Sequence, residues 1–121
     1  MQLNRAMIFV KDLDRMAAFY TSVLGLKPIE ETRLGNWVEF DAGPTRFALH
    51  AIPAEIAERI EIASPPRPRE TSSIKLSFEV ADVTRERERL ESLGVLVIER
   101  PWGAYDGVDP EGNVFGIYAA E

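Results

Sequence analysis

The side chains of this chain that could take part in chemistry are few. His50 is the single histidine among 121 residues, and there is no cysteine. A chain without cysteine cannot form disulfides, thiolate metal sites or a cysteine nucleophile. His50 could serve as a lone metal ligand or as a general base, since the pKa of an unperturbed imidazole is about 6.5. A single histidine on a strand is more often a structural or ligand-contacting residue, and we favour that interpretation.

Two cations, Arg5 and Lys75, occupy matching places in a repeated phrase. The first copy contains Val10-Lys11-Asp12-Leu13 and the second contains Val80-Ala81-Asp82-Val83, 70 residues later. Arg5 and Lys75 each stand five residues before the valine of their phrase. The repetition predicts two similar half-domains, with the two cations at equivalent positions.

Hydrophobic periodicity and turn residues predict the elements that position these side chains. Asp12 and Asp82 are expected helix N-caps, each followed by apolar residues at helical spacing, and Gly25 ends the first helix. The expected elements of the first half are a strand at 2–10, a helix at 13–24 and strands at 27–32, 36–41 and 45–51. The expected elements of the second half are a strand at 74–80, a helix at 83–93 and strands at 96–100, 103–108 and 113–119.

The length and charge of the chain narrow its class. A chain of 121 residues fits a single domain, in which 1–52 form the first module, 53–72 a linker with a short helix at 53–62, and 73–121 the second module. The net charge of −6 disfavours binding to nucleic acid or to an anionic membrane. The apolar run at 6–10 is too short for a signal peptide or a membrane span, so we expect a cytoplasmic protein.

Three motifs together resemble the vicinal oxygen chelate superfamily, which contains glyoxalase I, bleomycin-resistance proteins, fosfomycin-resistance enzymes and extradiol dioxygenases. They are Val10-Lys11-Asp12-Leu13 followed by Val23-Leu24-Gly25-Leu26, then Phe78-Glu79-Val80-Ala81-Asp82-Val83, then Asp109-Pro110-Glu111-Gly112-Asn113. The resemblance implies an α+β fold in which two βαβββ modules form a cup of curved mixed sheets. It also implies a homodimer.

In the catalytic branches of this family a divalent metal ion sits in the cup, held by His, Glu or Gln side chains. The four positions that the resemblance assigns to these ligands carry Arg5, Ala48, Lys75 and Gly116 in this sequence. Two cations and two residues without a donor side chain cannot hold a divalent cation, which requires carboxylate, carbonyl or imidazole ligands. We therefore expect no metal ion and no other cofactor.

Strand alternation places Arg5 and Met7 on the face of the first strand that looks into the cup, and Lys75 on the same face of its counterpart. An unpaired buried cation is costly, so each needs a partner unless its long side chain reaches solvent. An anionic group of a ligand is one such partner, since arginine suits a bidentate carboxylate or phosphate. An internal carboxylate is the other, and we favour it. The candidate carboxylates are Glu39, Glu79 and Asp106.

Aromatic side chains are expected to line the rim of the cup, where they suit flat organic ligands, although packing in the core or at a dimer contact would explain them as well. Trp37, Trp102 and Tyr105 are the rim candidates, and Tyr118 is the counterpart of His50 in the second module. Met7, Phe9 and Phe47 also fit plain core packing. The candidate ligand-binding residues are Arg5, Met7, Trp37, Glu39, His50, Lys75, Trp102, Tyr105 and Tyr118, and no catalytic residue is assigned.

These observations favour a metal-free protein of the bleomycin-resistance type that binds a small organic ligand. A ligand that carries an anionic group is one option. The alternative is a metal-dependent lyase, isomerase or dioxygenase that uses unconventional ligands, such as His50 with Glu39 or Asp106. A third option is a structural or regulatory domain without a pocket. Fold alone does not decide between these classes.

Overall fold

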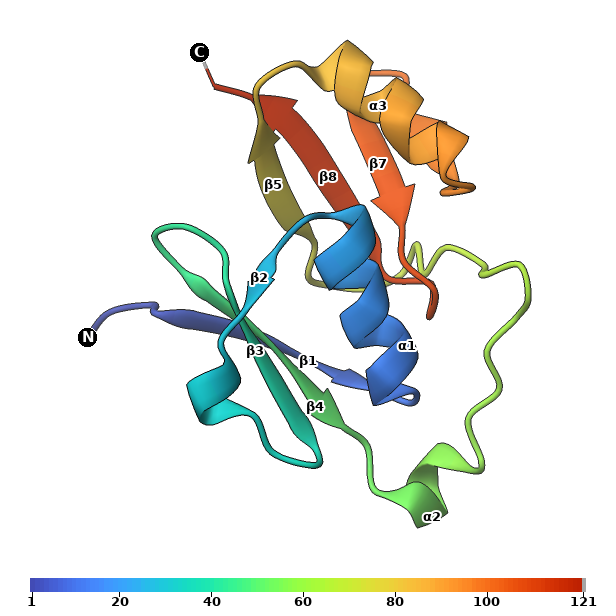
Figure 1. The fold of residues 1–121 in the computed structure, drawn as a ribbon. Coiled ribbons are helices and arrows are strands. Elements are labelled where there is room, and N and C mark those ends of the chain that lie inside the picture. The colour runs from blue at the N-terminus through green and yellow to red at the C-terminus, as the bar shows by residue number, and fades with distance from the viewer. Residues whose placement is uncertain (121) are drawn as a thin grey trace. The chain divides into compact units, whose positions relative to one another are not determined.

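The computed structural model describes residues 1–120 and divides into two compact units, Met1–Glu61 and Ile62–Glu121. The division falls inside the segment 53–72 that the sequence marks as a linker. Each unit contains one four-stranded mixed sheet and is described separately below (Figure 1).

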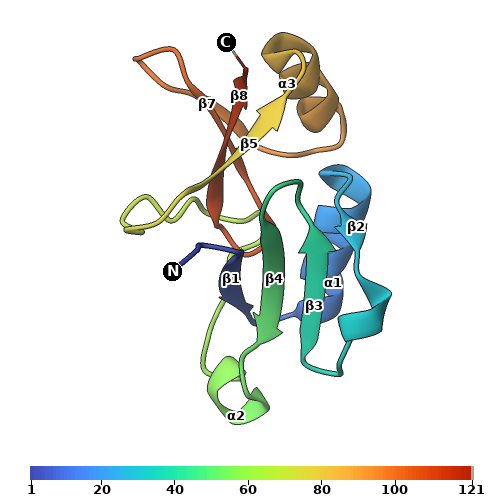
Figure 2. The ribbon, with the colours of Figure 1, turned by 90° about the vertical axis from the view of Figure 1, so that its left-hand side faces the viewer.

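The first unit is built around a sheet with the strand order β1-β4-β3-β2, in which β1 and β4 are parallel and the other pairs antiparallel. Figure 2 shows β1, β4 and β3 side by side. Its elements are β1 (Arg5–Val10), α1 (Leu13–Ala18), η1 (Phe19–Val23), β2 (Lys27–Pro28), η2 (Glu30–Thr32), β3 (Trp37–Asp41), β4 (Arg46–Ala51) and α2 (Ala54–Ala57).

The second unit repeats this arrangement with the strand order β5-β8-β7-β6, and again the first and last strands of the module are the parallel pair. Its elements are β5 (Leu76–Val80), α3 (Val83–Ser92), β6 (Val97–Glu99), β7 (Tyr105–Val108) and β8 (Val114–Ala119). The predicted pair of βαβββ modules is therefore confirmed.

One face of each sheet is covered by a helix, and the core of each unit lies between the two. In the first unit Tyr20, from η1, packs against Phe47 with ring centroids 4.8 Å apart, and Met16 is fully buried beside them. In the second unit Leu90 of α3 and Phe115 of β8 are buried. Burial of these apolar side chains is the main force that holds each helix on its sheet.

The helix boundaries follow the residues that predicted them. The side chains of Asp12 and Asp82 each accept a hydrogen bond from a backbone N–H three residues later, at 3.1 Å in both cases. Gly25 and Gly94 follow the helices with φ of 74° and 84°, a left-handed conformation that glycine adopts without a Cβ penalty. None of the helices in residues 1–120 combines the length and the apolar character that a membrane span requires.

Two predicted elements are much shorter than expected. The strand expected at 27–32 is only Lys27–Pro28, because the N–H and the hydroxyl of Thr32 both bond back to the carbonyl of Ile29 and close a 3-10 turn. The helix expected at 53–62 is the single turn Ala54–Ala57, after which Arg59 and Ile60 make only tighter i to i−3 bonds.

The packing beneath α3 leads to a first prediction. A Cβ on Gly107 would lie 2.3 Å from Cζ of the buried Phe115 ring, so Gly107→Ala should lower the free energy of unfolding by about 1–3 kcal/mol through overpacking. Chemical denaturation followed by circular dichroism measures this loss. Gly35→Ala is the control, since nothing lies within 4 Å of its Cβ position. Equal midpoints for wild type and Gly107→Ala would contradict the packing described.

Candidate functional site

The face of the first sheet opposite α1 carries the residues that could bind a ligand. Because strand side chains alternate between faces, the paired positions of β1, β4 and β3 form three rows on this open face. The rows are Phe9–His50–Trp37, Met7–Ala48–Glu39 and Arg5–Arg46–Asp41. Chemistry-bearing side chains therefore lie in every row, although they are dispersed along the sequence.

A buried carboxylate organises this face. Glu39 is 1% exposed, and its carboxylate accepts a hydrogen bond from Nε of Arg5 at 2.8 Å and from Nη1 of Arg46 at 3.4 Å. Burial by itself would raise the pKa of Glu39. The hydrogen bonds from Arg5 and Thr32 and the charges of the two arginines outweigh burial, so the pKa of Glu39 lies below its ordinary value of 4.5.

An aromatic row lies beside this ion-pair cluster. The guanidinium of Arg5 stands over the Trp37 ring, with Cζ 5.2 Å from the ring centroid. Trp37 in turn contacts His50 at 6.0 Å between centroids, and Phe9 contacts His50 from the other side at 5.3 Å. The Nδ1 atom of His50 is buried and has no hydrogen-bond partner among the described residues. His50 thus lies within an aromatic row.

The second unit has the same construction with different residues. Asp106 is 1% exposed and accepts hydrogen bonds from Nζ of Lys75 at 3.2 and 3.3 Å and from Nε of Arg100 at 2.8 Å. The two terminal nitrogens of Arg100 hold both carboxylate oxygens of Glu70, each at 2.8 Å. The hydrogen bonds that Arg100 donates, to Glu70 first and then to Asp106, raise the pKa of Arg100 above its usual value.

The two buried carboxylates occupy equivalent places. Glu39 pairs across the sheet with Ala48, and Asp106 pairs with Gly116. Ala48 and Gly116 are two of the four positions that the resemblance assigns to metal ligands. A Cβ on Gly116 would lie 3.1 Å from Oγ of Ser77 and 3.3 Å from Oδ1 of Asp106, so the space beside this glycine is already taken by Ser77 and the ion pair.

These residues do not fit a divalent metal ion. Arg5 and Lys75 are cations, Ala48 and Gly116 offer no donor, and the nearby carboxylates of Glu39 and Asp106 each already bond two cationic side chains. Within residues 1–120, no three His, Asp or Glu side chains lie close enough together to hold a metal ion. A metal would have to displace an ion pair that neutralises a buried charge.

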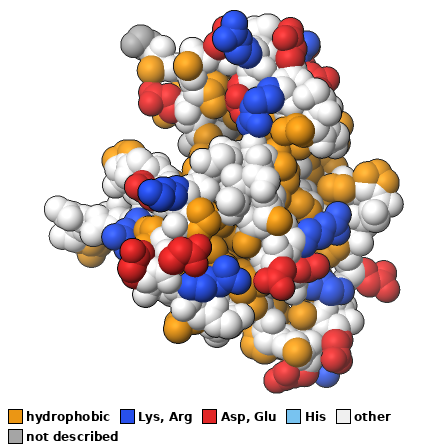
Figure 3. All heavy atoms as spheres, in the orientation of Figure 1, with side chains coloured by type: hydrophobic (Ala, Val, Ile, Leu, Met, Phe, Trp, Pro, Cys, Tyr) orange, Lys and Arg blue, Asp and Glu red, His pale blue; other side chains and the backbone are white. Residues whose placement is uncertain are grey.

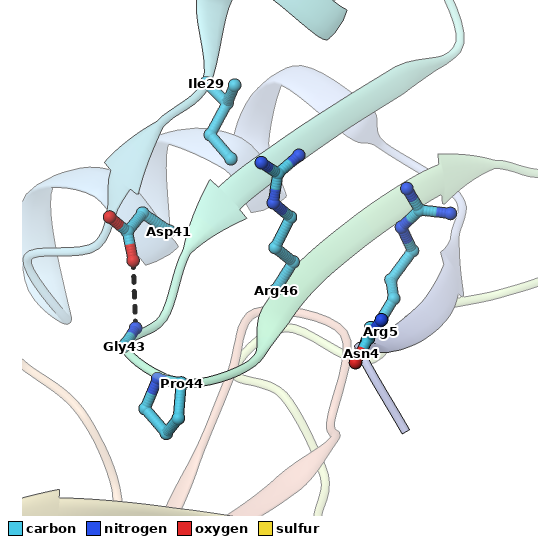
Figure 4. A pocket seen from close by; sticks show the side chains of 7 residues that line it. All are labelled: Asn4, Arg5, Ile29, Asp41, Gly43, Pro44 and Arg46. Atoms are coloured by element: carbon cyan, nitrogen blue, oxygen red, sulfur yellow. Dashed lines mark hydrogen bonds between the residues drawn. The ribbon is translucent and has the colours of Figure 1, made fainter. Parts of the chain in front are cut away.

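Each unit has a hollow next to its ion-pair cluster. The hollow of the first unit measures ≈ 810 Å³, and Arg5 and Arg46 line it (Figure 4). Its other lining residues are Asn4, Ile29, Asp41, Gly43 and Pro44. The hollow of the second unit measures ≈ 310 Å³ and includes Lys75, Arg100, Glu70, Trp102 and Asp106 in its lining.

The structure brings several predicted site residues together within each unit. Arg5, Trp37, Glu39 and His50 form one cluster in the first unit, and Met7, 43% exposed, lies on the same face. Phe9, which also fitted core packing, is 58% exposed on this face rather than buried. Lys75 and Trp102 line the hollow of the second unit. Tyr118 is 49% exposed on the open face of β8, opposite Glu79 of β5.

Tyr105 lies on the wrong face for a rim residue. Its ring is covered by the guanidinium of Arg87 from α3, 5.0 Å away, and therefore faces the helix. The cause is a turn of different length. Four residues, 42–45, join β3 to β4, whereas five, 109–113, join β7 to β8. The register equivalent of Trp37 is consequently Ala104, and a shift of one residue reverses the face of a strand side chain.

Three residues of the ion-pair clusters, Arg46, Glu70 and Arg100, are not among the site residues that the sequence predicts. Arg46 stands two positions before Ala48, so alternation along the strand places it on the open face and could have revealed it. Glu70 lies outside the strands, where no periodicity indicates the direction of a side chain, whereas Arg100 ends the strand expected at 96–100 and lies one residue beyond β6 in the structure. On the face shown in Figure 3, basic and acidic side chains are interspersed rather than gathered by sign.

The buried charge of Glu39 generates a pH prediction. At neutral pH, Glu39→Gln should lower the free energy of unfolding by about 1–3 kcal/mol. The loss is no larger because both arginines are half exposed, so that solvent screens their attraction to Glu39. A carboxyl with a lowered folded-state pKa stabilises the fold above its unfolded-state pKa, and this contribution is lost as pH falls through the folded-state value. The curves of wild type and Glu39→Gln should therefore converge as pH falls below 4.5.

Denaturant titrations at a series of pH values measure this convergence. The matched control is Glu55→Gln, a substitution at an exposed position of α2 that should follow the wild-type curve throughout. A gap between wild type and Glu39→Gln that stays constant down to acid pH would show that Glu39 does not carry the charge described.

Comparisons with known proteins agree with this architecture. A sequence profile of the Glyoxalase/Bleomycin resistance protein/Dioxygenase superfamily matches residues 2–117. A glyoxalase/bleomycin resistance protein/dioxygenase family enzyme from Burkholderia phytofirmans PsJN is 30% identical, with a TM-score of 0.70 over 100% of both chains. A protein of unknown function from Agrobacterium tumefaciens str. C58 is 28% identical, with a TM-score of 0.71 over 100% of this chain and 95% of that one.

A lactoylglutathione lyase from Agrobacterium tumefaciens is 25% identical, with a TM-score of 0.67 over 98% of this chain and 93% of that one. No curated protein sequence matches the chain. The family profile covers nearly the whole chain, and the fold has the paired modules that the repeat predicted. This protein belongs to the glyoxalase/bleomycin resistance protein/dioxygenase superfamily.

Proposed function

We propose that this protein is a metal-free binding protein that holds a small organic ligand against the open faces of its sheets, in the manner of a bleomycin-resistance protein. The proposal includes a homodimer, which is the assembly that the family resemblance implies. The lyase activity in the name of the Agrobacterium relative belongs to that protein, and we do not transfer it to this chain.

One observation carries the proposal, namely that each unit neutralises its own buried carboxylate with cations. Arg5 and Lys75 stand at two of the positions assigned to metal ligands, and each bonds the carboxylate next to it. A divalent cation at this place would meet two positive charges and would compete for carboxylates that are already bonded. The hydrogen-bond donors and aromatic rings of this face suit the recognition of a small organic ligand.

The aromatic row supports binding of an organic ligand. Trp37 and Phe9 flank His50 on an open sheet face, and Phe9 and Met7 remain substantially exposed. Exposed apolar side chains next to a few oriented polar groups are typical of small-molecule sites. The enzymatic alternative, with His50 and Glu39 as metal ligands, is disfavoured because both carboxylate oxygens of Glu39 accept from arginines.

Metal analysis tests the metal-free part of the proposal. Protein purified without chelator should contain far less than one equivalent of any transition metal, and a chelator should leave its unfolding temperature unchanged, because no described group depends on a metal. Mass spectrometry of the metal content and thermal unfolding measure the two quantities. Stoichiometric nickel, zinc, manganese or iron would overturn the proposal in favour of a metalloenzyme.

Tryptophan fluorescence tests the binding part. Compounds that bind the first unit should change the emission of Trp37, since its ring lies in the aromatic row. The response should persist in Trp102→Phe and disappear in Trp37→Phe. A panel of neutral and anionic aromatic compounds that produces no response in any of these proteins would favour a domain without a pocket.

A further inference from the structure

We propose that the first unit binds the anionic group of its ligand, a carboxylate or a phosphate, through the terminal guanidinium nitrogens of Arg5 and Arg46. The ligand class is then a small organic acid or phosphate ester with an apolar body. This inference rests on the proposed function and adds to it the chemical group that is recognised and the two residues that recognise it.

Arg5 is oriented for this task before any ligand arrives. Its Nε bonds the buried Glu39 at 2.8 Å, and its guanidinium plane stands over Trp37. These two contacts fix the side chain and leave its terminal nitrogens without an acceptor among the described residues. A guanidinium edge with two parallel N–H groups matches the two oxygens of a carboxylate or phosphate.

Arg46 supplies the second donor group. It rises from the neighbouring strand β4 toward the same side of the sheet as Arg5, and both line the hollow of ≈ 810 Å³ (Figure 4). Within its guanidinium only Nη1 makes a described hydrogen bond, to Glu39 at the long distance of 3.4 Å, so the remaining guanidinium N–H groups are available. About half of each arginine side chain is exposed, and a ligand can reach both from solvent.

The second unit shows how such a donor set is satisfied by a carboxylate. There, all three guanidinium nitrogens of Arg100 are occupied, one by Asp106 and two by Glu70. Glu70 grips the terminal fork with two 2.8 Å bonds, the geometry that we infer for a ligand carboxylate on Arg5. Arg5 of the first unit presents the same pair of terminal nitrogens, but no residue that lines its hollow bonds them.

The local charge balance indicates that donor geometry, rather than net charge, drives binding. The two positive charges of Arg5 and Arg46 face the negative charges of Glu39 and Asp41. Asp41 directs Oδ1 to the backbone N–H of Gly43 at 3.0 Å, away from the arginines (Figure 4). Its carboxylate still weakens the attraction for an anion. We therefore expect a modest, salt-sensitive affinity that depends on the arginine forks.

The apolar part of the ligand has a place on the same strand. Met7 and Phe9 follow Arg5 on the open face, at steps of about 7 Å along an extended chain. Both remain exposed, and Trp37 lies across the sheet from Phe9. An aromatic or aliphatic acid whose charged group contacts Arg5 can lay its apolar body over these side chains.

The experiment uses three probes, inorganic phosphate, phenylacetate and the neutral isostere phenylacetamide, titrated into the full chain. Nuclear magnetic resonance of the arginine Nε–H and tryptophan indole signals follows each titration. Phosphate and phenylacetate should shift the Arg5 Nε–H signal saturably at concentrations up to about 20 mM, well above a millimolar dissociation constant. Phenylacetamide should bind at least about five-fold more weakly than phenylacetate, because it lacks the charge-assisted contact.

Variants separate this site from others. Arg46→Met and Arg5→Lys should each weaken phenylacetate binding about five-fold, the latter because lysine keeps the charge but loses the fork. Arg33→Met removes an exposed arginine whose one ion-pair partner within residues 1–120 is Asp14, at 3.7 Å, and should leave binding unchanged. Glu70→Ala removes both acceptor oxygens, so it should free the fork of Arg100 and add a second anion site, seen as a new shift of the Arg100 Nε–H signal.

The outcomes for this inference and for the proposed function are distinguishable. Equal affinity for phenylacetate and phenylacetamide, unchanged affinity in Arg46→Met, or no response of Arg5 to either anion would each overturn the anion site. The metal-free binding function would survive those results if neutral aromatic compounds still quench Trp37. Conversely, anion binding that appears only after a metal ion is added would overturn the proposed function itself.

Discussion

A carboxylate buried next to the centre of each sheet, balanced by cations, is the constraint on which the rest of this structure depends. Glu39 and Asp106 are almost wholly removed from water, and a buried charge without a partner would cost far more than a small domain can afford. Arg5 must therefore stay on the open face of β1, and Lys75 must stay one residue before β5, on the side of the second sheet where Asp106 lies. That requirement fixes the orientation of both parallel strands, since a shift of one residue would turn each cation toward the helix.

The same constraint explains why this chain departs from the catalytic members of its superfamily at the four assigned positions. Ala48 and Gly116 each pair across the sheet with the buried carboxylate of their unit, and atoms of Ser77, Asp106 and Lys75 surround the position that a Cβ on Gly116 would take. An ion pair and a metal centre are alternative ways to hold polar groups in the same place. Both modules contain such an ion pair, formed by arginine and glutamate in the first and by lysine and aspartate in the second.

Much of this could be predicted from the sequence, for identifiable reasons. The repeated phrase predicted the modules, and alternation placed Arg5, Met7 and Lys75 on the open face, because both signals are local. The cost of an unpaired buried cation favoured internal pairing of Arg5 and Lys75, although the sequence left Glu39, Glu79 and Asp106 as candidate partners. The face of Tyr105 was mispredicted, because it depends on a turn that is one residue longer than its counterpart. Glu70 and Arg100 form an ion pair although they are 30 residues apart in the sequence, and no local sequence pattern predicts such a contact.

The ion pairs are also local to their own unit. Every described partner of the Glu39 carboxylate, namely Arg5, Arg46 and Thr32, lies in Met1–Glu61, and both described partners of the Asp106 carboxylate lie in the other unit. Each half is therefore electrostatically self-sufficient, and its charge balance does not depend on where the other half lies. If such halves are exchanged or repositioned during evolution, each buried carboxylate keeps its cation, because both belong to the same half.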